Sequence, residues 1–187
     1  LDSYKLVVAP GLEVLTDAAA KNLIAYVRNG GHLVLGQRAA MKDGDNGLQP
    51  ERGPGPLASL LGGRVDQFYA IDDKPGDTVP VTGVWGNTTS KIWAERLSTS
   101  APDVQVLMRF GKSNGWLDGQ PAAITRKVGK GRITYIGAWM DEATVLNASK
   151  VMAETSGVTA AFGPVPDGVD VYPREGDGKK LFILVNF

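Results

Sequence analysis

The stretch Tyr4–Arg38, YKLVVAPGLEVLTDAAAKNLIAYVRNGGHLVLGQR, decides the fold class, because it predicts a strand, a helix and a second strand in succession. Lys5–Ala9 is a short apolar run, and Pro10-Gly11 ends it. Thr16 is suited to cap the helix that follows, and Asp17 places a negative charge in its first turn. The stretch therefore opens with a strand and a well-marked helix start.

The helix of this stretch is expected to bury one apolar face and to end at a glycine pair. Its apolar residues recur at i, i+3, i+4 and i+7, and they are Ala20, Leu23, Ile24 and Val27. Gly30-Gly31 is expected to form a left-handed cap, and Leu33–Leu35 begins the second strand. Two apolar strands joined by a crossover helix form a parallel, right-handed pair, so the sequence predicts an α/β domain.

The composition is that of an ordinary globular domain. Hydrophobic residues make up 43% of the 187, which argues against disorder. Lys plus Arg equals Asp plus Glu, at 20 each, so no charge excess indicates nucleic acid or an anionic membrane as a partner. No apolar run reaches the length of a membrane span, and no signal peptide is recognisable. Cysteine is absent, which excludes disulfides and thiolate chemistry and fits a reducing compartment such as the cytoplasm.

The two ends of the sequence suggest a piece of a longer protein. There is no initiator Met, and residues 1–162 are expected to form the main domain. The segment Gly163–Gly168, GPVPDG, has the composition of a linker. Residues 169–187 predict a β-hairpin. Because a lone hairpin buries too little apolar surface, this one is expected to open a further, truncated β domain.

The middle of the chain is expected to extend the sheet with antiparallel strands. Ala39–Pro56 predicts a long loop, and Asp72–Ser90 predicts a turn-rich segment. Gly129-Lys130-Gly131 supplies the positive φ angles of a hairpin turn. Asp141 is expected to cap a last helix that ends at Gly157 and whose buried face carries Val145, Ala148, Ser149 and Met152. The short helix is expected at Leu57–Leu61, and the strands at Arg64–Ile71, Lys91–Leu97, Val104–Phe110, Ala122–Val128 and Arg132–Gly137.

Two patterns that resemble catalytic motifs have simpler explanations. Gly111–Gly115, GKSNG, matches the nucleophile elbow G-x-S-x-G, but the WLDGQP that follows cannot start a regular helix. The triad of such an enzyme also needs a downstream histidine, whereas the sole histidine, His32, lies upstream. His32 is expected to be a strand-edge residue rather than a zinc ligand. An elbow-type hydrolase is therefore disfavoured.

Carboxylates and tryptophans leave a role in carbohydrate contact open. Glycoside hydrolysis needs two carboxyl groups across a cleft, but the pair Asp141 and Glu142 is better explained as a helix N-terminus. Trp85 and Trp116 are flanked by glycine or asparagine and are candidates for stacking on sugar rings. Trp85 and Trp93 lie in a weakly periodic stretch and are also candidates for an interface. Packing in the chain's own core is the alternative for each of them.

Four segments, in their order along the chain, carry a resemblance to a known family. They are YKLVVAPGL (Tyr4–Leu12), AYVRNGGHLVLGQRAAMKDGDN (Ala25–Asn46), PGPLASLLGGRVDQF (Pro54–Phe68) and PAAITRKVGKGRITYIGAWMDE (Pro121–Glu142). Together they resemble the trimerisation domain of family 42 glycoside hydrolases, the β-galactosidases. The terminal GVDVYPREGDGKKLFILVNF resembles the start of that family's small C-terminal β domain.

The resemblance implies a flavodoxin-like, class I glutamine-amidotransferase-like three-layer domain with a mixed sheet. It implies that both catalytic glutamates lie on an N-terminal (β/α)₈ barrel that precedes Leu1. The implied role is a non-catalytic oligomerisation module without a catalytic residue, cofactor or metal of its own. Its implied partners are its own barrel and the sister subunits of a homotrimer, and it meets a galactoside only through the parent enzyme. A carbohydrate-contacting accessory domain is the alternative.

The loop 37–56 is where a contact with another domain or subunit is expected. It leaves the carboxyl end of a parallel strand, the edge where open α/β sheets place their contacts. Arg38, Lys42 and Asp43 are the candidate residues, and their loop is similar to the family's R-x-G-x-x-D-E loop. Ala40 and Gly44 stand where that pattern has Gly and Glu. A flexible, solvated loop is the alternative.

Overall fold

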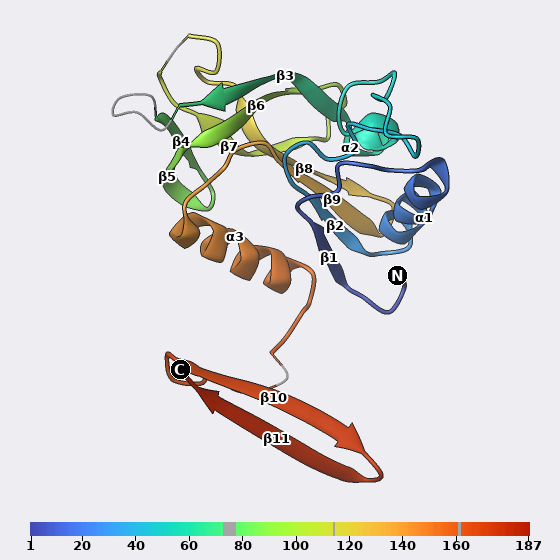
Figure 1. Cartoon of the computed structure of the whole chain (residues 1–187), viewed down its shortest axis with the longest axis vertical. Helices are drawn as coiled ribbons and strands as arrows, with labels where there is room; N and C mark the ends of the chain where they lie inside the picture. Colours follow the sequence, from blue (N-terminus) through green and yellow to red (C-terminus); the bar gives the residue numbers. More distant parts are fainter. Residues whose placement is uncertain (73–77, 114, 161) are drawn as a thin grey trace.

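The computed structural model describes residues 1–72, 78–113, 115–160 and 162–187, and it shows a mixed, curled sheet with few helices (Figure 1). The helical elements are α1 (Asp17–Arg28), η1 (Gly55–Leu57), α2 (Ala58–Leu61) and α3 (Glu142–Thr155). The strands are β1 (Leu6–Ala9), β2 (His32–Leu35), β3 (Gly63–Ile71), β4 (Val79–Gly83), β5 (Gly86–Ser90), β6 (Ile92–Thr99), β7 (Gln105–Phe110), β8 (Pro121–Val128), β9 (Gly131–Ile136), β10 (Val169–Gly176) and β11 (Lys179–Asn186). Within the described ranges, the main sheet has the order β1-β2-β9-β8-β7-β4-β5, while β3–β6 and β10–β11 form separate pairs.

The predicted strand–helix–strand unit at the start of the chain is confirmed. β1 and β2 pair in parallel, with Leu6 opposite His32, and the side chain of Thr16 accepts a hydrogen bond from the backbone N–H of Ala19. At the end of α1, Gly31 lies directly beneath the ring of Tyr26, where an added Cβ would be 2.1 Å from the nearest ring atom. The glycine pair is therefore needed for close packing as well as for ending the helix.

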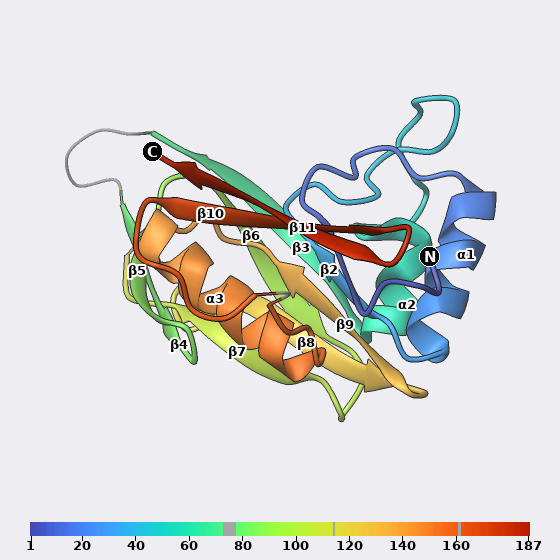
Figure 2. The same ribbon diagram turned by 90° about the horizontal axis from the view of Figure 1, so that it is seen from below.

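Alternation along β2 divides the core between the two faces of the sheet. Leu33 and Leu35 belong to a cluster that contains the buried face of α1, whereas Val34 belongs to a second cluster that contains Ala148 and Met152 of α3. Successive side chains of a strand point to opposite faces, so α1 and α3 cover opposite sides of this part of the sheet. Figure 2 shows the two helices separated in this way.

The burial of the two long helices differs from the prediction in detail. In α1, Ala20, Leu23 and Val27 are buried as expected, but Tyr26 is buried while Ile24 is only partly so. The predicted cap of α3 is confirmed, since Asp141 accepts a hydrogen bond from the N–H of Thr144 at 2.8 Å. The buried residues of α3 are Thr144, Ala148 and Met152, whereas Val145, expected on the buried face, is exposed. The apolar pattern predicted the position of each helix in the sequence correctly, but it did not predict all of the residues that face the core.

The prediction that Asp72–Ser90 is only turn-rich was wrong for most of that segment. β4 and β5 pair antiparallel, and β4 also pairs with β7, so this hairpin extends the main sheet. Residues 73–77 of the predicted segment lie outside the described residues. The strands were missed because threonine, asparagine and proline dilute the apolar alternation, and β5 is an edge strand of the sheet, where such dilution is common. The turn of the hairpin carries Trp85, which is buried.

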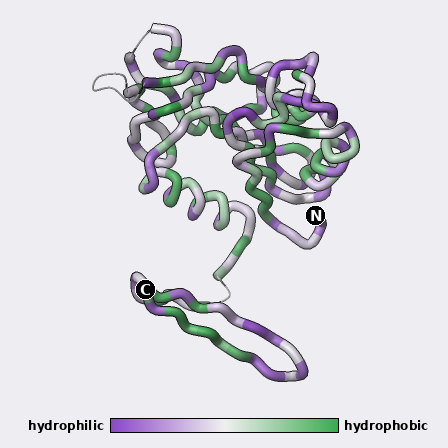
Figure 3. Tube along the Cα trace, in the orientation of Figure 1, coloured by the Kyte–Doolittle hydropathy of each residue, from purple (hydrophilic) through white to green (hydrophobic). Residues whose placement is uncertain are grey.

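Near the C-terminus, β10 and β11 pair antiparallel, with Val169 opposite Asn186. The pair stands apart from the main sheet (Figure 1), and β11 is hydrophobic through much of its length (Figure 3). Leu181, Ile183 and Leu184 are exposed. A two-stranded ribbon with an uncovered apolar strand has marginal stability by itself, so these side chains need a covering surface.

None of the helices in the described ranges has the length and apolar character needed to cross a membrane.

His32 is a buried structural residue at the entry of β2. Its Nδ1 lies 2.8 Å from Oγ of Ser156, and its Nε2 lies 2.8 Å from Oγ1 of Thr134. Both ring nitrogens of His32 are therefore hydrogen-bonded to hydroxyl groups of the chain itself. Burial, assisted by the charge of Arg132, lowers the pKa of His32 to about 4.

We expect acid to destabilise the chain through His32. Because its pKa is lower in the folded state than in the unfolded state, the stabilisation is fully present above about pH 6.5 and is lost as pH falls toward 4. The expected loss is about 3 kcal/mol of the free energy of unfolding, measured by urea unfolding at pH 7 and near pH 4. His32→Gln retains a polar side chain but does not titrate, so it should reduce the pH dependence by that amount. An unchanged pH dependence would contradict this account.

Candidate contact site around Trp93

The loops that leave three parallel strands meet at one edge of the main sheet. Pro10 and Gly11 follow β1, Arg38 follows β2, and Trp139 lies shortly after β9. Together with Ile92 and Trp93 at the start of β6, these residues line one shallow pocket. This is the carboxyl edge, where open α/β sheets place their contacts.

A buried carboxylate lies behind this edge and connects its parts. Glu95 of β6 is 1% exposed. Its carboxylate accepts hydrogen bonds from the hydroxyl of Tyr135 at 2.6 Å, from the indole Nε1 of Trp93 at 3.0 Å and from the backbone N–H of Arg38 at 2.9 Å. Burial raises the pKa of Glu95, and the three hydrogen bonds partly oppose that effect. The same burial and the neighbouring carboxylate raise the pKa of Tyr135 well above its usual value. Glu95 thus fixes the first turn of the loop 37–56 against β6.

The outer side of the site is charged and aromatic. The guanidinium of Arg38 lies 5.7 Å from the centre of the Trp93 ring and donates to the carboxylate of Glu13 at 2.7 Å. Nζ of Lys42 lies 3.3 Å from the same carboxylate, so Glu13 is paired with two cationic side chains. Phe68 also stacks on Trp93, with ring centres 5.0 Å apart. The side chains of Glu13 and Arg38 remain partly exposed.

Backbone conformations at this edge are unusual. Arg38, Ala40 and Ile92 have φ angles of 61°, 52° and 64°, a region that side-chain-bearing residues rarely adopt. Ile92 is β-branched, for which such a φ is a true outlier. The N–H of Trp139 donates to the carbonyl of Trp93 and thereby ties the strained turn to the end of β9. Strain of this kind is concentrated at functional sites in proteins. We call Glu13, Arg38, Ile92, Trp93 and Trp139 the Trp93 surface.

The structure separates the residues that the sequence nominated. Arg38 and Lys42 lie at the Trp93 surface, but the carboxylate of Asp43 accepts hydrogen bonds from the N–H groups of Asp45 and Gly47 within its own loop. Asp43 therefore shapes the loop 37–56.

The tryptophans occupy different environments. Trp85 is 3% exposed and fills the chain's own core, so its indole is not presented to a sugar or a second subunit. Trp93 is partly buried. Trp116 is 63% exposed and tilts against Tyr69 at 5.3 Å between ring centres. Trp139 is also exposed, and it lies just after the parallel strand β9.

The arrangement is better suited to holding a partner than to chemistry. Both oxygens of Glu95 accept hydrogen bonds, and Glu13 is paired with two cations. Among the described residues, no group of three His, Asp or Glu side chains could hold a metal ion. Partly exposed tryptophan and arginine on a rigid support are the residue types that dominate protein interfaces.

Comparison with known proteins identifies the family. The β-galactosidase trimerisation domain model matches residues 1–158. β-Galactosidase Bga of Halorubrum lacusprofundi is 33% identical over 185 residues, which cover 94% of this chain and 26% of the relative. β-Galactosidase BglY of Alicyclobacillus acidocaldarius is 31% identical over 195 residues, which cover 100% of this chain and 28% of the relative. The chain thus spans about a quarter of the length of these relatives.

Solved structures agree with this assignment. A β-galactosidase from the Antarctic haloarchaeon Halorubrum lacusprofundi superposes with a TM-score of 0.80 at 32% identity, over 100% of this chain and 26% of that one. A GH42 β-galactosidase from G. stearothermophilus superposes with a TM-score of 0.90 at 18% identity, over 100% of this chain and 26% of that one, which shows a shared fold. The chain therefore belongs to the β-galactosidase trimerisation domain family.

Proposed function

We propose that this chain assembles the subunits of a β-galactosidase-type glycoside hydrolase through its Trp93 surface. The parent enzyme hydrolyses terminal β-galactosides on a separate barrel domain, and the chain described here takes no part in the chemistry. The observation that carries the proposal is the clustering of Arg38, Trp93 and Trp139 at one strained edge, supported from behind by Glu95. Lys42 extends this surface along the loop 37–56.

The proposal extends to the domain organisation and partners. Residues 1–162 form a flavodoxin-like, amidotransferase-like unit, 163–168 a linker, and 169–187 the first hairpin of a small β domain. The exposed apolar residues of β11 support this organisation, because they need a cover that the described residues do not provide. The partners of the chain are the barrel domain of its own subunit and the sister subunits of a homotrimer.

A second candidate function is direct contact with carbohydrate. The observation that favours it is the exposure of Trp116, which lies against Tyr69 and presents an indole to solvent. Indole faces stack on the apolar faces of sugar rings through the same physics that drives aromatic packing. Trp116 is therefore retained as the candidate for such a contact, whereas the buried Trp85 is set aside.

We expect the isolated 187-residue chain to hydrolyse no galactoside. The carboxylates of Glu95 and Glu13 are committed to hydrogen bonds and ion pairs, and glycoside hydrolysis needs an acid and a nucleophile or base facing each other across a cleft. The measurement is release of nitrophenol from an aryl β-galactoside, with the full-length enzyme as the positive control. Turnover by the purified chain that a point substitution within it abolished would overturn the proposal.

A further inference from the structure

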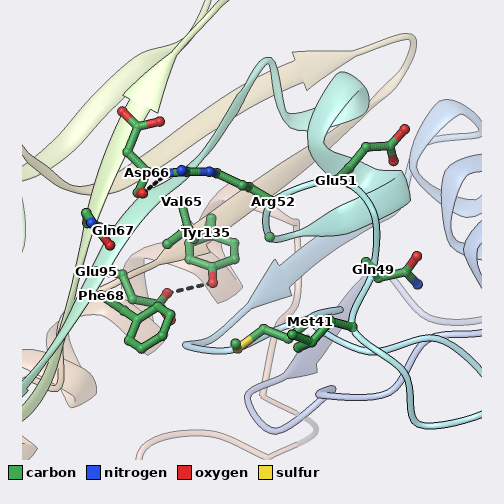
Figure 4. A pocket seen from close by; sticks show the side chains of 12 residues that line it. Met41, Gln49, Glu51, Arg52, Val65, Asp66, Gln67, Phe68, Glu95 and Tyr135 are labelled. Atoms are coloured by element: carbon green, nitrogen blue, oxygen red, sulfur yellow. Dashed lines mark hydrogen bonds between the residues drawn. The ribbon is translucent and has the colours of Figure 1, made fainter.

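A pocket of about 260 Å³ opens on the side of Glu95 away from Arg38, between the loop 37–56 and strand β3 (Figure 4). Its floor is formed by the buried pair Glu95 and Tyr135, joined by the 2.6 Å hydrogen bond. Drug-sized ligands occupy sites of roughly 300–1,000 Å³, so this pocket has room for about one ring. Neither the Trp93 surface nor the assembly role uses it.

The wall of the pocket offers a flat apolar platform. Phe68 is half exposed and lines the pocket, while Trp93 stacks on it with an interplanar angle of 14°. The phenyl ring is thus held in place by a second aromatic ring. Val65 and Met41 continue the apolar wall (Figure 4). A ligand with one apolar face would bury that face here.

The rim and floor are polar but close to electrically balanced. The carboxylates of Glu51, Asp66 and Glu95 line the pocket with the guanidinium of Arg52, and Asp66 is also paired with Arg64 at 3.0 Å. The Arg52 guanidinium donates to the backbone carbonyl of Asp66, which fixes it at the rim. This balance offers little attraction to an anion or to a strong cation and favours a neutral, polar ligand.

Hydrogen-bonding groups of both kinds converge on the same space. Glu95 is 1% exposed, accepts three hydrogen bonds and closes the bottom of the pocket, so the polar groups open to a ligand are those of more exposed lining residues such as Gln67. Gln67 and Arg52 line the pocket, as does Gln49, whose amide Nε2 donates to the backbone carbonyls of Leu15 and Lys42. A ring with one apolar face and several hydroxyl groups matches this arrangement of an aromatic wall with polar groups around it.

We propose that this pocket binds a single neutral hexopyranose ring, with its apolar C–H face on Phe68 and its hydroxyl groups toward Gln67 and Arg52. The site is distinct from Trp116 and needs no second subunit, so it does not depend on the assembly role. Affinity of a small half-open site for one sugar ring is expected in the range of about 1 mM.

The indole N–H of Trp93 is a built-in reporter, because it donates to Glu95 at the floor of the pocket. The chain contains 4 tryptophans, so its ¹⁵N-labelled spectrum has four indole signals to compare. Titration of the 187-residue chain with D-galactose and with D-glucose is expected to move the Trp93 signal saturably while the buried Trp85 signal stays in place. L-Arginine, titrated in parallel, represents a partner's cationic side chain.

Two substitutions make the test specific to the pocket. Phe68→Ala is expected to weaken sugar binding at least about tenfold, which corresponds to the 1.4 kcal/mol scale of a lost stacking platform. Gln67→Ala is exposed, leaves the core untouched and is expected to weaken binding severalfold. The matched control is Gln105→Ala, the same change on the remote strand β7, which should leave the affinity unchanged.

Other outcomes would overturn the proposal. No shift of the Trp93 signal with either sugar would show that the pocket does not bind hexopyranoses. A shift confined to Trp116 would place the sugar elsewhere. A saturable response to L-arginine without one to the sugars would show that the pocket receives a cationic group. Equal sugar affinities of the Gln67→Ala and Gln105→Ala variants would show that the sugar does not bind in this pocket.

Discussion

Replacing Glu95 by alanine is expected to lower the free energy of unfolding of the chain by about 4 kcal/mol. Glu95 is 1% exposed and is the acceptor for three donors: the hydroxyl of Tyr135, the indole N–H of Trp93 and the backbone N–H of Arg38. Alanine leaves all three without that acceptor, and an unsatisfied buried donor costs roughly 1–3 kcal/mol. The loss of unfolding free energy is expected to stay below the sum of three such costs, because water can enter from the neighbouring pocket and hydrogen-bond to the freed donors. Urea unfolding at pH 7 measures the effect.

Glu13→Ala is the matched control for this prediction. It removes a carboxylate of the same chemistry that pairs with Arg38 and Lys42 on the partly exposed outer side of the site. Ion pairs of that kind contribute about 0–1 kcal/mol, so the two substitutions should differ severalfold in their cost. Similar costs for Glu95→Ala and Glu13→Ala would mean that the buried hydrogen-bond network does not hold the loop 37–56.

The elements that could be predicted are those whose signals lie within a short stretch of sequence. The first strand, α1 and β2 follow from apolar spacing and from the caps at Thr16 and Gly30, all within about one helix and two strands. The hairpin β8–β9 follows from a glycine-rich turn. The hairpin β4–β5 could not be found in the same way, because polar residues interrupt its apolar alternation and its outer strand, β5, lies at the edge of the sheet.

The candidate site was predicted only in part, because it joins positions that lie far apart in the sequence. Arg38 could be nominated from the rule that contacts gather at the carboxyl ends of parallel strands. Glu95 could not, since a glutamate between Ala94 and Arg96 looks solvated until Tyr135 and Trp93 are seen to donate to it. The contrast between Trp85 and Trp93 also needs the structure, since both lie in one weakly periodic stretch and only Trp85 is fully buried.

Replacing Trp93 by alanine in the full-length enzyme is expected to weaken subunit association by about 30-fold or more, the equivalent of ~2 kcal/mol for a well-placed interface anchor. Trp93 carries Arg38 on its ring, so loss of the indole removes the centre of the Trp93 surface, while the backbone hydrogen bond from Trp139 remains. Arg38→Ala should weaken association in the same direction but by less, because part of its energy goes to the exposed pair with Glu13.

The most direct test of the assembly role is the mass in solution of two tryptophan variants of the full-length enzyme. Trp85→Ala removes an indole from the core, and Trp93→Ala removes one from the Trp93 surface. Sedimentation equilibrium across a dilution series is expected to show that Trp93→Ala shifts the enzyme toward smaller species, whereas Trp85→Ala lowers the melting temperature and keeps the wild-type mass. A Trp93→Ala enzyme that keeps the wild-type mass at every concentration, with only a lower melting temperature, would contradict assembly through this surface.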